Sequence, residues 1–128
     1  MWIITIMGEL NSEANRVTFR TLDGNGKLPS ENSALKDWYI SVRDVPVPDM
    51  SIFDLARACR QNLFLEAVVP ISIQTLGQDV LAGELYDGEL VSALMHIPDD
   101  YWNMNYDQWS RFVPLAEAAF KEVGEENL

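Results

Sequence analysis

The amino-acid sequence predicts an α+β fold, in which a small N-terminal antiparallel sheet is followed by a C-terminal part of four helices. In about the first 45 residues, apolar side chains form short runs or alternate with polar ones, which is typical of strands. After residues 45–48 (VPVP), apolar side chains instead recur every three or four positions, which is typical of helices. The 128 residues have the size of a single domain, with a β-rich segment at 1–45 and a helical segment at 50–124.

Three strands are expected in the first segment. Residues 2–7 (WIITIM) are an apolar run rich in isoleucine, and residues 16–20 (RVTFR) alternate polar and apolar side chains. Residues 38–43 (WYISVR) would place three apolar side chains on one face: Trp38, Ile40 and Val42. Residues 23–26 (DGNG) indicate a turn, because Gly and Asn tolerate positive φ angles. The prolines at 46 and 48 are expected to hold an extended connector, since neither has a backbone N–H.

Four helices are expected after the connector, and capping residues and prolines indicate where they begin and end. The first begins at Ser51, which has Asp54 three residues on, the second covers Leu65–Gln78, the third runs from Asp87 to the residue before Pro98, and the fourth runs from about Asn105 to Val123. In the first helix, the apolar stripe includes Cys59, which is expected to be a small core residue.

Charge is the strongest signal in the composition. Twenty acidic and nine basic residues give a formal net charge of −11. Such a surface repels nucleic acid and anionic membranes, and it attracts cationic proteins. An acidity that serves solubility alone is the alternative explanation. The longest apolar runs, of about six residues, are far shorter than the ~20 that span a bilayer. With a single cysteine and no basic leader at its N-terminus, the chain is expected to be cytoplasmic.

Three carboxylates are concentrated in residues 81–90 (LAGELYDGEL), which contain no basic side chain. Asp87 is expected to be the N-cap of the third helix, and Glu89 lies in its first turn, where both favour the positive end of the helix dipole. Capping leaves Glu84 and Tyr86 unexplained. One alternative is a small enzyme in which Glu84 and Asp100 perform acid–base chemistry.

Motifs typical of enzymes and of cofactor sites are missing from the sequence. It contains no Gly-rich phosphate loop, no G-x-S-x-G and no H-E-x-x-H, and His96 is its only histidine. Residues 23–26 resemble the start of an EF-hand but lack the downstream glutamate. We therefore expect no cofactor, no metal and no enzymatic activity.

Three stretches in this order carry a family resemblance: DLARACRQ (54–61), LAGELYDGEL (81–90) and ALMHIPDDYW (93–102). Over about residues 50–112 the chain resembles the helical bacterial immunity proteins of contact-dependent growth inhibition, the CdiI type. Leu85, between Glu84 and Tyr86, departs from the family's pattern. The resemblance implies a protein that binds the C-terminal toxin domain of a cognate CdiA protein in a 1:1 complex and neutralises it. Because such toxins are often nucleases, it also implies a cationic partner whose basic cleft is occluded by acids, without direct contact to nucleic acid or membrane.

The site residues expected from this resemblance fall into two sets. Solvated acids and aromatic residues are expected to contact the toxin: Asp79, Glu84, Tyr86, Asp99, Asp100 and Tyr101. Four residues of the shared motif are expected to be structural, with either arginine reaching the acids of the 84–89 turn: Arg57, Arg60, Asp87 and Glu89. A non-inhibitory adaptor or structural protein-binding module is the alternative function.

Overall fold

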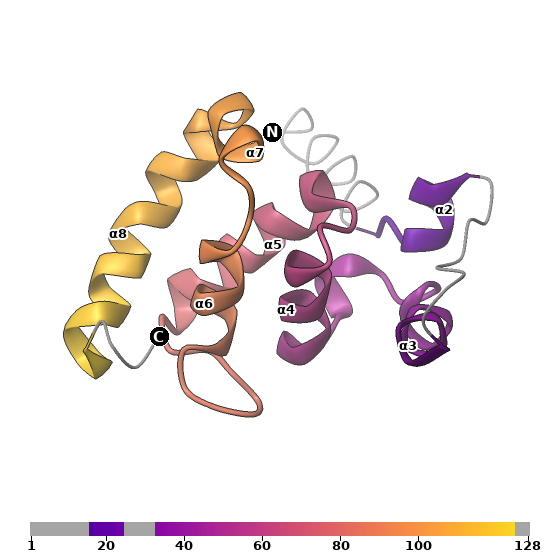
Figure 1. Cartoon of the computed structure of the whole chain (residues 1–128), viewed down its shortest axis with the longest axis horizontal. Helices are drawn as coiled ribbons and strands as arrows, with labels where there is room; N and C mark the ends of the chain where they lie inside the picture. Colours follow the sequence, from indigo (N-terminus) through magenta and orange to yellow (C-terminus); the bar gives the residue numbers. More distant parts are fainter. Residues whose placement is uncertain (1–15, 25–32, 125–128) are drawn as a thin grey trace, which may run out of the picture. The chain divides into compact units, whose positions relative to one another are not determined.

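A computed structural model of the chain describes residues 16–24 and 33–124. These residues form helices joined by turns, and none of them lies in a strand (Figure 1). The chain separates into two compact units, residues 1–50 and residues 51–128.

The first unit is helical in its described part, so the predicted N-terminal antiparallel sheet is wrong. Its elements are the helices α2 (Phe19–Asp23) and α3 (Ser33–Val42) and the 3₁₀ turn η1 (Val47–Asp49). Helix α2 begins within the second expected strand, and α3 occupies most of the third. The first expected strand, at residues 2–7, lies outside the described residues.

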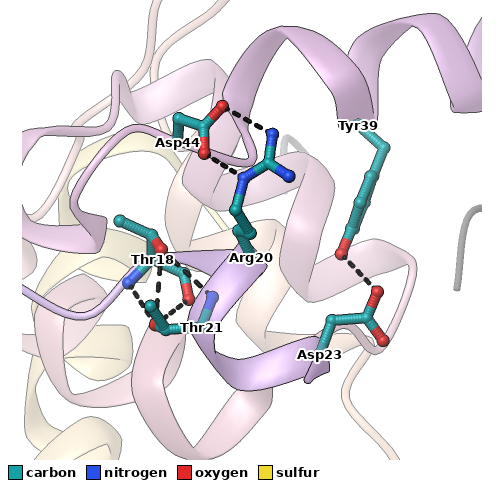
Figure 2. Close-up of polar contacts among 6 residues, drawn as sticks. All are labelled: Thr18, Arg20, Thr21, Asp23, Tyr39 and Asp44. Atoms are coloured by element: carbon teal, nitrogen blue, oxygen red, sulfur yellow. Dashed lines mark hydrogen bonds and ion pairs between the residues drawn. The ribbon is translucent and has the colours of Figure 1, made fainter. Parts of the chain in front are cut away.

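Local capping explains why residues 16–20 do not continue as a strand. Thr18 has an extended backbone and is the N-cap of α2. Its hydroxyl accepts a hydrogen bond from the backbone N–H of Thr21 at 3.2 Å, and the hydroxyl of Thr21 accepts one from the N–H of Thr18 at 3.1 Å (Figure 2). These two bonds form a capping box, which satisfies N–H groups that a helix start otherwise leaves without partners. Five alternating residues were too short to distinguish a strand from this helix start.

The burial pattern of α3 is helical, although its sequence also fits alternation. Trp38, Tyr39 and Val42 are buried, whereas Ile40 is 41% exposed. Buried residues at positions i, i+1 and i+4 share one face of a helix, and a strand would have buried Ile40 with Trp38. Phe19 of α2 completes this small core, because its ring stacks on Tyr39 with centroids 5.9 Å apart. Burial and the nearby Asp23, which accepts the Tyr39 hydroxyl at 3.3 Å, raise the pKa of Tyr39 (Figure 2).

The expected extended connector is also wrong, because η1 forms at Val47–Asp49. Pro46 is the residue before this turn and Pro48 lies inside its first positions, where a missing N–H costs nothing. The N–H of Val47 donates to the carbonyl of Val17 at 2.9 Å. An exposed ion pair between Arg20 and Asp44, with nitrogen–oxygen distances of 2.5 and 3.0 Å, links the same two stretches (Figure 2). The hydrogen bonds from Arg20 lower the pKa of the Asp44 carboxyl.

The second unit contains five helices in its described part, one more than predicted. They are α4 (Ile52–Arg60), α5 (Leu65–Gln78), α6 (Glu89–Met95), α7 (Asp99–Met104) and α8 (Tyr106–Val123). Helix α5 has the predicted bounds, and α8 begins one residue after the predicted start. The predictions missed α7, a helix of six residues that begins directly after Pro98.

Helix α6 is the centre of the second unit. All its residues except Met95 are buried, including Glu89. A helix that is buried on every side must be surrounded, and α6 packs against α4, α5 and α8. Cys59 of α4 lies in this core, fully buried, with its Sγ 4.0 Å from the Ser72 hydroxyl. This burial confirms Cys59 as a small core residue, and it raises the pKa of the thiol to about 12.

Within the described parts of the chain, no helix is both long enough and apolar enough to cross a membrane.

Candidate protein-binding surface

The acidic stretch 81–90 forms a closed loop between α5 and α6. Its two ends are joined by backbone hydrogen bonds, from Gly88 N–H to the Leu81 carbonyl at 3.0 Å and from Leu90 N–H to the Ala82 carbonyl at 3.1 Å. Gly83 permits this closure, because a Cβ at that position would lie 1.9 Å from the carbonyl oxygen of Tyr86. The loop therefore has one compact conformation, and only glycine fits at position 83.

Glu89 organises this loop from inside. Its side chain is completely buried, and its Oε1 accepts hydrogen bonds from the backbone N–H groups of Glu84 at 2.8 Å and Leu85 at 3.2 Å. Its Oε2 has no hydrogen-bond partner among the described residues. A buried carboxylate that accepts two backbone N–H groups holds the loop in place, and it is not accessible to a partner.

The prediction that Asp87 caps α6 is wrong. The N-cap is Gly88, one residue later, and no side chain caps the helix there. Gly88 has a φ of +86°, a conformation that favours glycine and that ends the loop with a sharp turn. The side chain of Asp87 is exposed.

Glu84 caps α4 and not α6, the helix that follows its own loop. Its Oε2 accepts the backbone N–H of Phe53, in the first turn of α4, at 2.7 Å. In the same turn the hydroxyl of Ser51 accepts the N–H of Asp54 at 3.1 Å, as predicted for the start of this helix. At the other end of α4, the guanidinium of Arg60 donates to the Tyr86 hydroxyl at 3.2 Å. The loop is thus fastened along α4 by one carboxylate and one arginine.

The arginines of the shared motif differ in what they reach. Arg60 contacts the hydroxyl of Tyr86 rather than the expected carboxylate. Arg57 is half-buried on α4. Leu85, at the apex of the loop, is 69% exposed and was not among the predicted contact residues. A single exposed apolar side chain is common on protein surfaces and does not by itself identify a binding site.

The second group of predicted residues lies at the start of α7. Asp99 and Asp100 are exposed in its first turn. Tyr101 is half-buried, and its hydroxyl donates to Oε1 of Gln108 at 2.5 Å, with the Leu65 carbonyl oxygen 3.3 Å away. Burial, assisted by the charge of Glu66, raises the pKa of Tyr101 to about 12. Tyr101 therefore connects α7 to α8 and α5.

The structure does not bring the two predicted groups together. The loop with Asp79, Glu84 and Tyr86 precedes α6, whereas Asp99 and Asp100 follow its other end (Figure 1). Seven helical residues separate the two ends by roughly 10 Å. Glu84 and Asp100 consequently do not form the acid–base pair that the enzyme alternative required. In the part of the chain that the structure describes, no three His, Cys, Asp or Glu side chains are grouped as metal ligands.

Both groups are negatively charged, and both lie in a stretch of sequence that contains no Lys or Arg. This stretch runs from Gln61 to Ser110. The same stretch contains eight acidic residues, and all except Glu89 are exposed: Glu66, Asp79, Glu84, Asp87, Glu89, Asp99, Asp100 and Asp107. This stretch, from here on the acidic segment, runs from the residue after α4 into the start of α8 and gives the second unit an acidic surface.

The second unit combines a closed acidic loop with an exposed acidic surface, which suits a unit that binds a cationic protein. Comparison with known families shows to which family the chain belongs. The sequence model of one family, the CDI immunity proteins, matches residues 22–112, which is most of the chain. The chain belongs to this family. A search of curated proteins found no match.

Family membership confirms the resemblance seen in the sequence and extends it. The motifs indicated about residues 50–112, whereas the match begins at residue 22, within α2 of the first unit. The chain is thus a bacterial immunity protein of contact-dependent growth inhibition, in a family of toxin inhibitors that bind the toxin domain of a cognate CdiA protein. The family is generally non-enzymatic.

Proposed function

We propose that this immunity protein neutralises a cationic nuclease domain of its cognate CdiA protein, in a 1:1 complex, by covering the basic cleft that binds nucleic acid. The observation that carries the proposal is the acidic segment, with seven exposed carboxylates and no Lys or Arg between Gln61 and Ser110. Nucleases bind phosphates through clustered Lys and Arg, and carboxylates placed at the same positions compete with phosphates.

The start of α7 is the main contact in this proposal. Asp99 and Asp100 are exposed, and the large side chains of Tyr106 (71% exposed) and Trp109 (37% exposed) follow them in sequence. Tight interfaces combine aromatic anchors with surrounding charges, and this part of the surface offers both. Tyr86, in the 81–90 loop, and Asp79, just before it, form a second contact.

Four of the predicted contact residues make internal hydrogen bonds, which limits what they offer a partner. Oδ1 of Asp79 accepts the Leu81 N–H at 3.0 Å, and the Tyr86 hydroxyl accepts from Arg60. The other two are Glu84 and Tyr101. Glu84 uses Oε2 for the N–H of Phe53, and Tyr101 uses its hydroxyl for Gln108. In the proposal both hold neighbouring contact residues in position: Glu84 fastens the loop to α4, and Tyr101 fastens the start of α7 to the rest of the unit.

Three further parts of the proposal follow from the charge, from the mode of inhibition and from the place where the toxin acts. An acidic surface repels phosphate groups, so the protein binds neither nucleic acid nor anionic membranes directly. Inhibition by occlusion needs no catalysis, and the protein has no activity of its own. A toxin that cleaves nucleic acid acts inside the cell, which places its inhibitor in the cytoplasm.

The test is an inhibition and competition assay with the purified cognate CdiA toxin domain. We expect the toxin to cleave DNA or RNA, and one equivalent of the immunity protein to abolish cleavage. A non-cleavable oligonucleotide should displace the immunity protein from the toxin, because both need the same cleft. A toxin without nuclease activity, or a stable ternary complex of toxin, oligonucleotide and immunity protein, would contradict the proposal.

A further inference from the structure

An apolar groove lies beside the start of α7. It is formed by residues 95–99 and one side of α8, and its volume is about 310 Å³. On one side it is lined by Met95, at the end of α6, and by Ile97, between α6 and α7. On the other side it is lined by Trp109, Val113 and Phe120 of α8. Two carboxylates, of Asp99 and Glu117, also line the groove.

We propose that this groove anchors the toxin domain by receiving one apolar side chain from a toxin segment that also carries Lys or Arg. The inference rests on the proposed function, and it deepens it by assigning an apolar anchor beside the acids. The acids then supply attraction and orientation, whereas the groove determines how long the complex lasts.

The groove wall is ordered before any partner binds. Trp102 stacks on Phe112 with centroids 5.3 Å apart and an interplanar angle of 6°. Trp109 packs against the same Trp102 at 5.3 Å, yet it remains 37% exposed. An aromatic side chain that is already fixed by its neighbours loses little conformational entropy on binding, so it is suited to be an anchor point.

A second hollow shares lining residues with the groove. This hollow has a volume of about 250 Å³ and is lined by residues that include Asp99, Asn103 and Tyr106. Asp99, Trp102 and Trp109 line both hollows. A partner segment that lies across these shared residues can therefore place one side chain in each hollow and a cation beside Asp99.

Charge and size favour this occupant over the alternatives. Two copies of a chain with a net charge of −11 would bring the carboxylates of Asp99 and Glu117 toward one another, which disfavours self-association at this rim. A volume of about 310 Å³ is at the lower end of the range for small-molecule pockets, roughly 300 to 1,000 Å³, and suits one or two side chains. A cationic partner gains from both the acids and the apolar surface.

Two methionines provide a matched pair of variants. Met95 is the last residue of α6, is 47% exposed and lines the groove. Met104 is the last residue of α7, is 86% exposed and lines neither hollow. The changes Met95→Glu and Met104→Glu add the same charge at the same position of a helix. They differ in whether the new carboxylate lies in the groove, and Met104 is also the more exposed of the two.

The experiment measures association and dissociation of the cognate CdiA toxin domain with the full-length immunity protein and both variants, by surface binding at fixed salt. We expect Met95→Glu to dissociate at least about tenfold faster than the parent protein and Met104→Glu to stay within about twofold, because interface changes act mainly on dissociation. Thermal unfolding by circular dichroism should show that both variants remain folded. If Met95→Glu unfolds, Met95→Gln replaces it, with the same expected direction.

A second measurement reports on the groove in the unchanged protein. With ¹³C-labelled methionine methyl groups, the signal of Met95 should shift on addition of the toxin domain, and that of Met104 should not. If the parent protein binds with a salt-dependent on-rate while Met95→Glu dissociates like it and the Met95 signal stays in place, the groove proposal is wrong and the proposed function stands. If the parent protein does not bind the toxin domain at all, both are wrong.

Discussion

The carboxylate of Glu84 accepts the backbone N–H of Phe53, 31 residues earlier in the chain, at 2.7 Å. This bond connects the acidic loop at residues 81–90 to the first turn of α4, where helix N–H groups lack partners within the helix. Together with the buried Glu89, it shows that two of the three carboxylates in residues 81–90 stabilise the loop. Of these three carboxylates, only Asp87 has no such role, and its side chain is exposed.

The first prediction compares Glu84 with Asp87. Glu84→Ala removes a side-chain cap from α4 and should lower the free energy of unfolding by about 1 kcal/mol. Asp87→Ala removes an exposed carboxylate that caps no helix and should change it by less than about 0.5 kcal/mol. Urea unfolding followed by circular dichroism measures both. A larger loss for Asp87→Ala than for Glu84→Ala would show that the helix starts are assigned wrongly.

The second prediction concerns Glu89. Glu89→Ala leaves the N–H groups of Glu84 and Leu85 without their acceptor and should lower the free energy of unfolding by about 2 to 4 kcal/mol. Glu89→Gln keeps one carbonyl acceptor and should cost less. Hydrogen exchange gives the local readout, because the amides of Glu84 and Leu85 should lose protection in the alanine variant. Unchanged protection of these two amides would contradict the role given to Glu89.

The third prediction concerns loop closure. In Gly83→Ala the new Cβ would overlap the Tyr86 carbonyl oxygen, 1.9 Å away, so the backbone must move. We expect a loss of about 1 to 3 kcal/mol in unfolding free energy, as for other overpacked sites. Gly77→Ala is the control, because a Cβ at Gly77 meets nothing within 4 Å and alanine favours the interior of α5. Equal stability of the two variants would mean that the loop adapts freely.

The fourth prediction is a pH dependence that arises from Tyr101. Its pKa is raised to about 12 in the folded protein, compared with about 10 for an unfolded tyrosine. The folded state therefore retains the phenol proton more strongly, and this contribution to stability is complete below pH 10 and is lost as the pH rises toward 12. The difference in urea midpoint between the parent protein and Tyr101→Phe should narrow over that range. A constant difference would show that the hydroxyl is not buried.

The sequence predicted the second unit well wherever the signals were local. The Ser51 cap and the bounds of α5 depend on residues a few positions apart, and both were correct. Helix α7 was missed because six residues give too little periodicity, and Pro98 indicated an end rather than a new start. In the first unit, Trp38 and Val42 fit both a strand and a helix, and the burial of Tyr39 instead of Ile40, which distinguishes them, depends on packing against Phe19.

For the candidate site, the sequence predicted which acidic residues are present but not how they are arranged. The sequence identified the carboxylates of residues 81–90 and 99–100, but not which of them turn inward. Glu89 is buried because the backbone N–H groups of Glu84 and Leu85 point at it, and those directions follow from loop closure at Gly83. The exposed Leu85 and the groove beside Trp109 depend on tertiary packing, which no short spacing in the sequence reveals.

The central claim is that the acids of the second unit steer a cationic toxin domain to the start of α7. Two double variants with the same net charge test whether position matters: Asp99→Lys with Asp100→Lys, and Asp37→Lys with Asp49→Lys. All four aspartates are exposed, and the second pair lies in the first unit. If position matters, the first pair should slow association with the toxin domain much more than the second.

Stopped-flow association with the cognate CdiA toxin domain across a salt series is the most direct measurement. Because the Debye length falls from ~10 Å at 0.1 M to ~3 Å at 1 M ionic strength, the on-rate of the parent protein should drop at least about tenfold while the off-rate changes less. The Asp99 and Asp100 double variant should associate slowly at low salt and lose most of this salt dependence. An on-rate that is indifferent to salt and equal in both double variants would contradict steering by these acids.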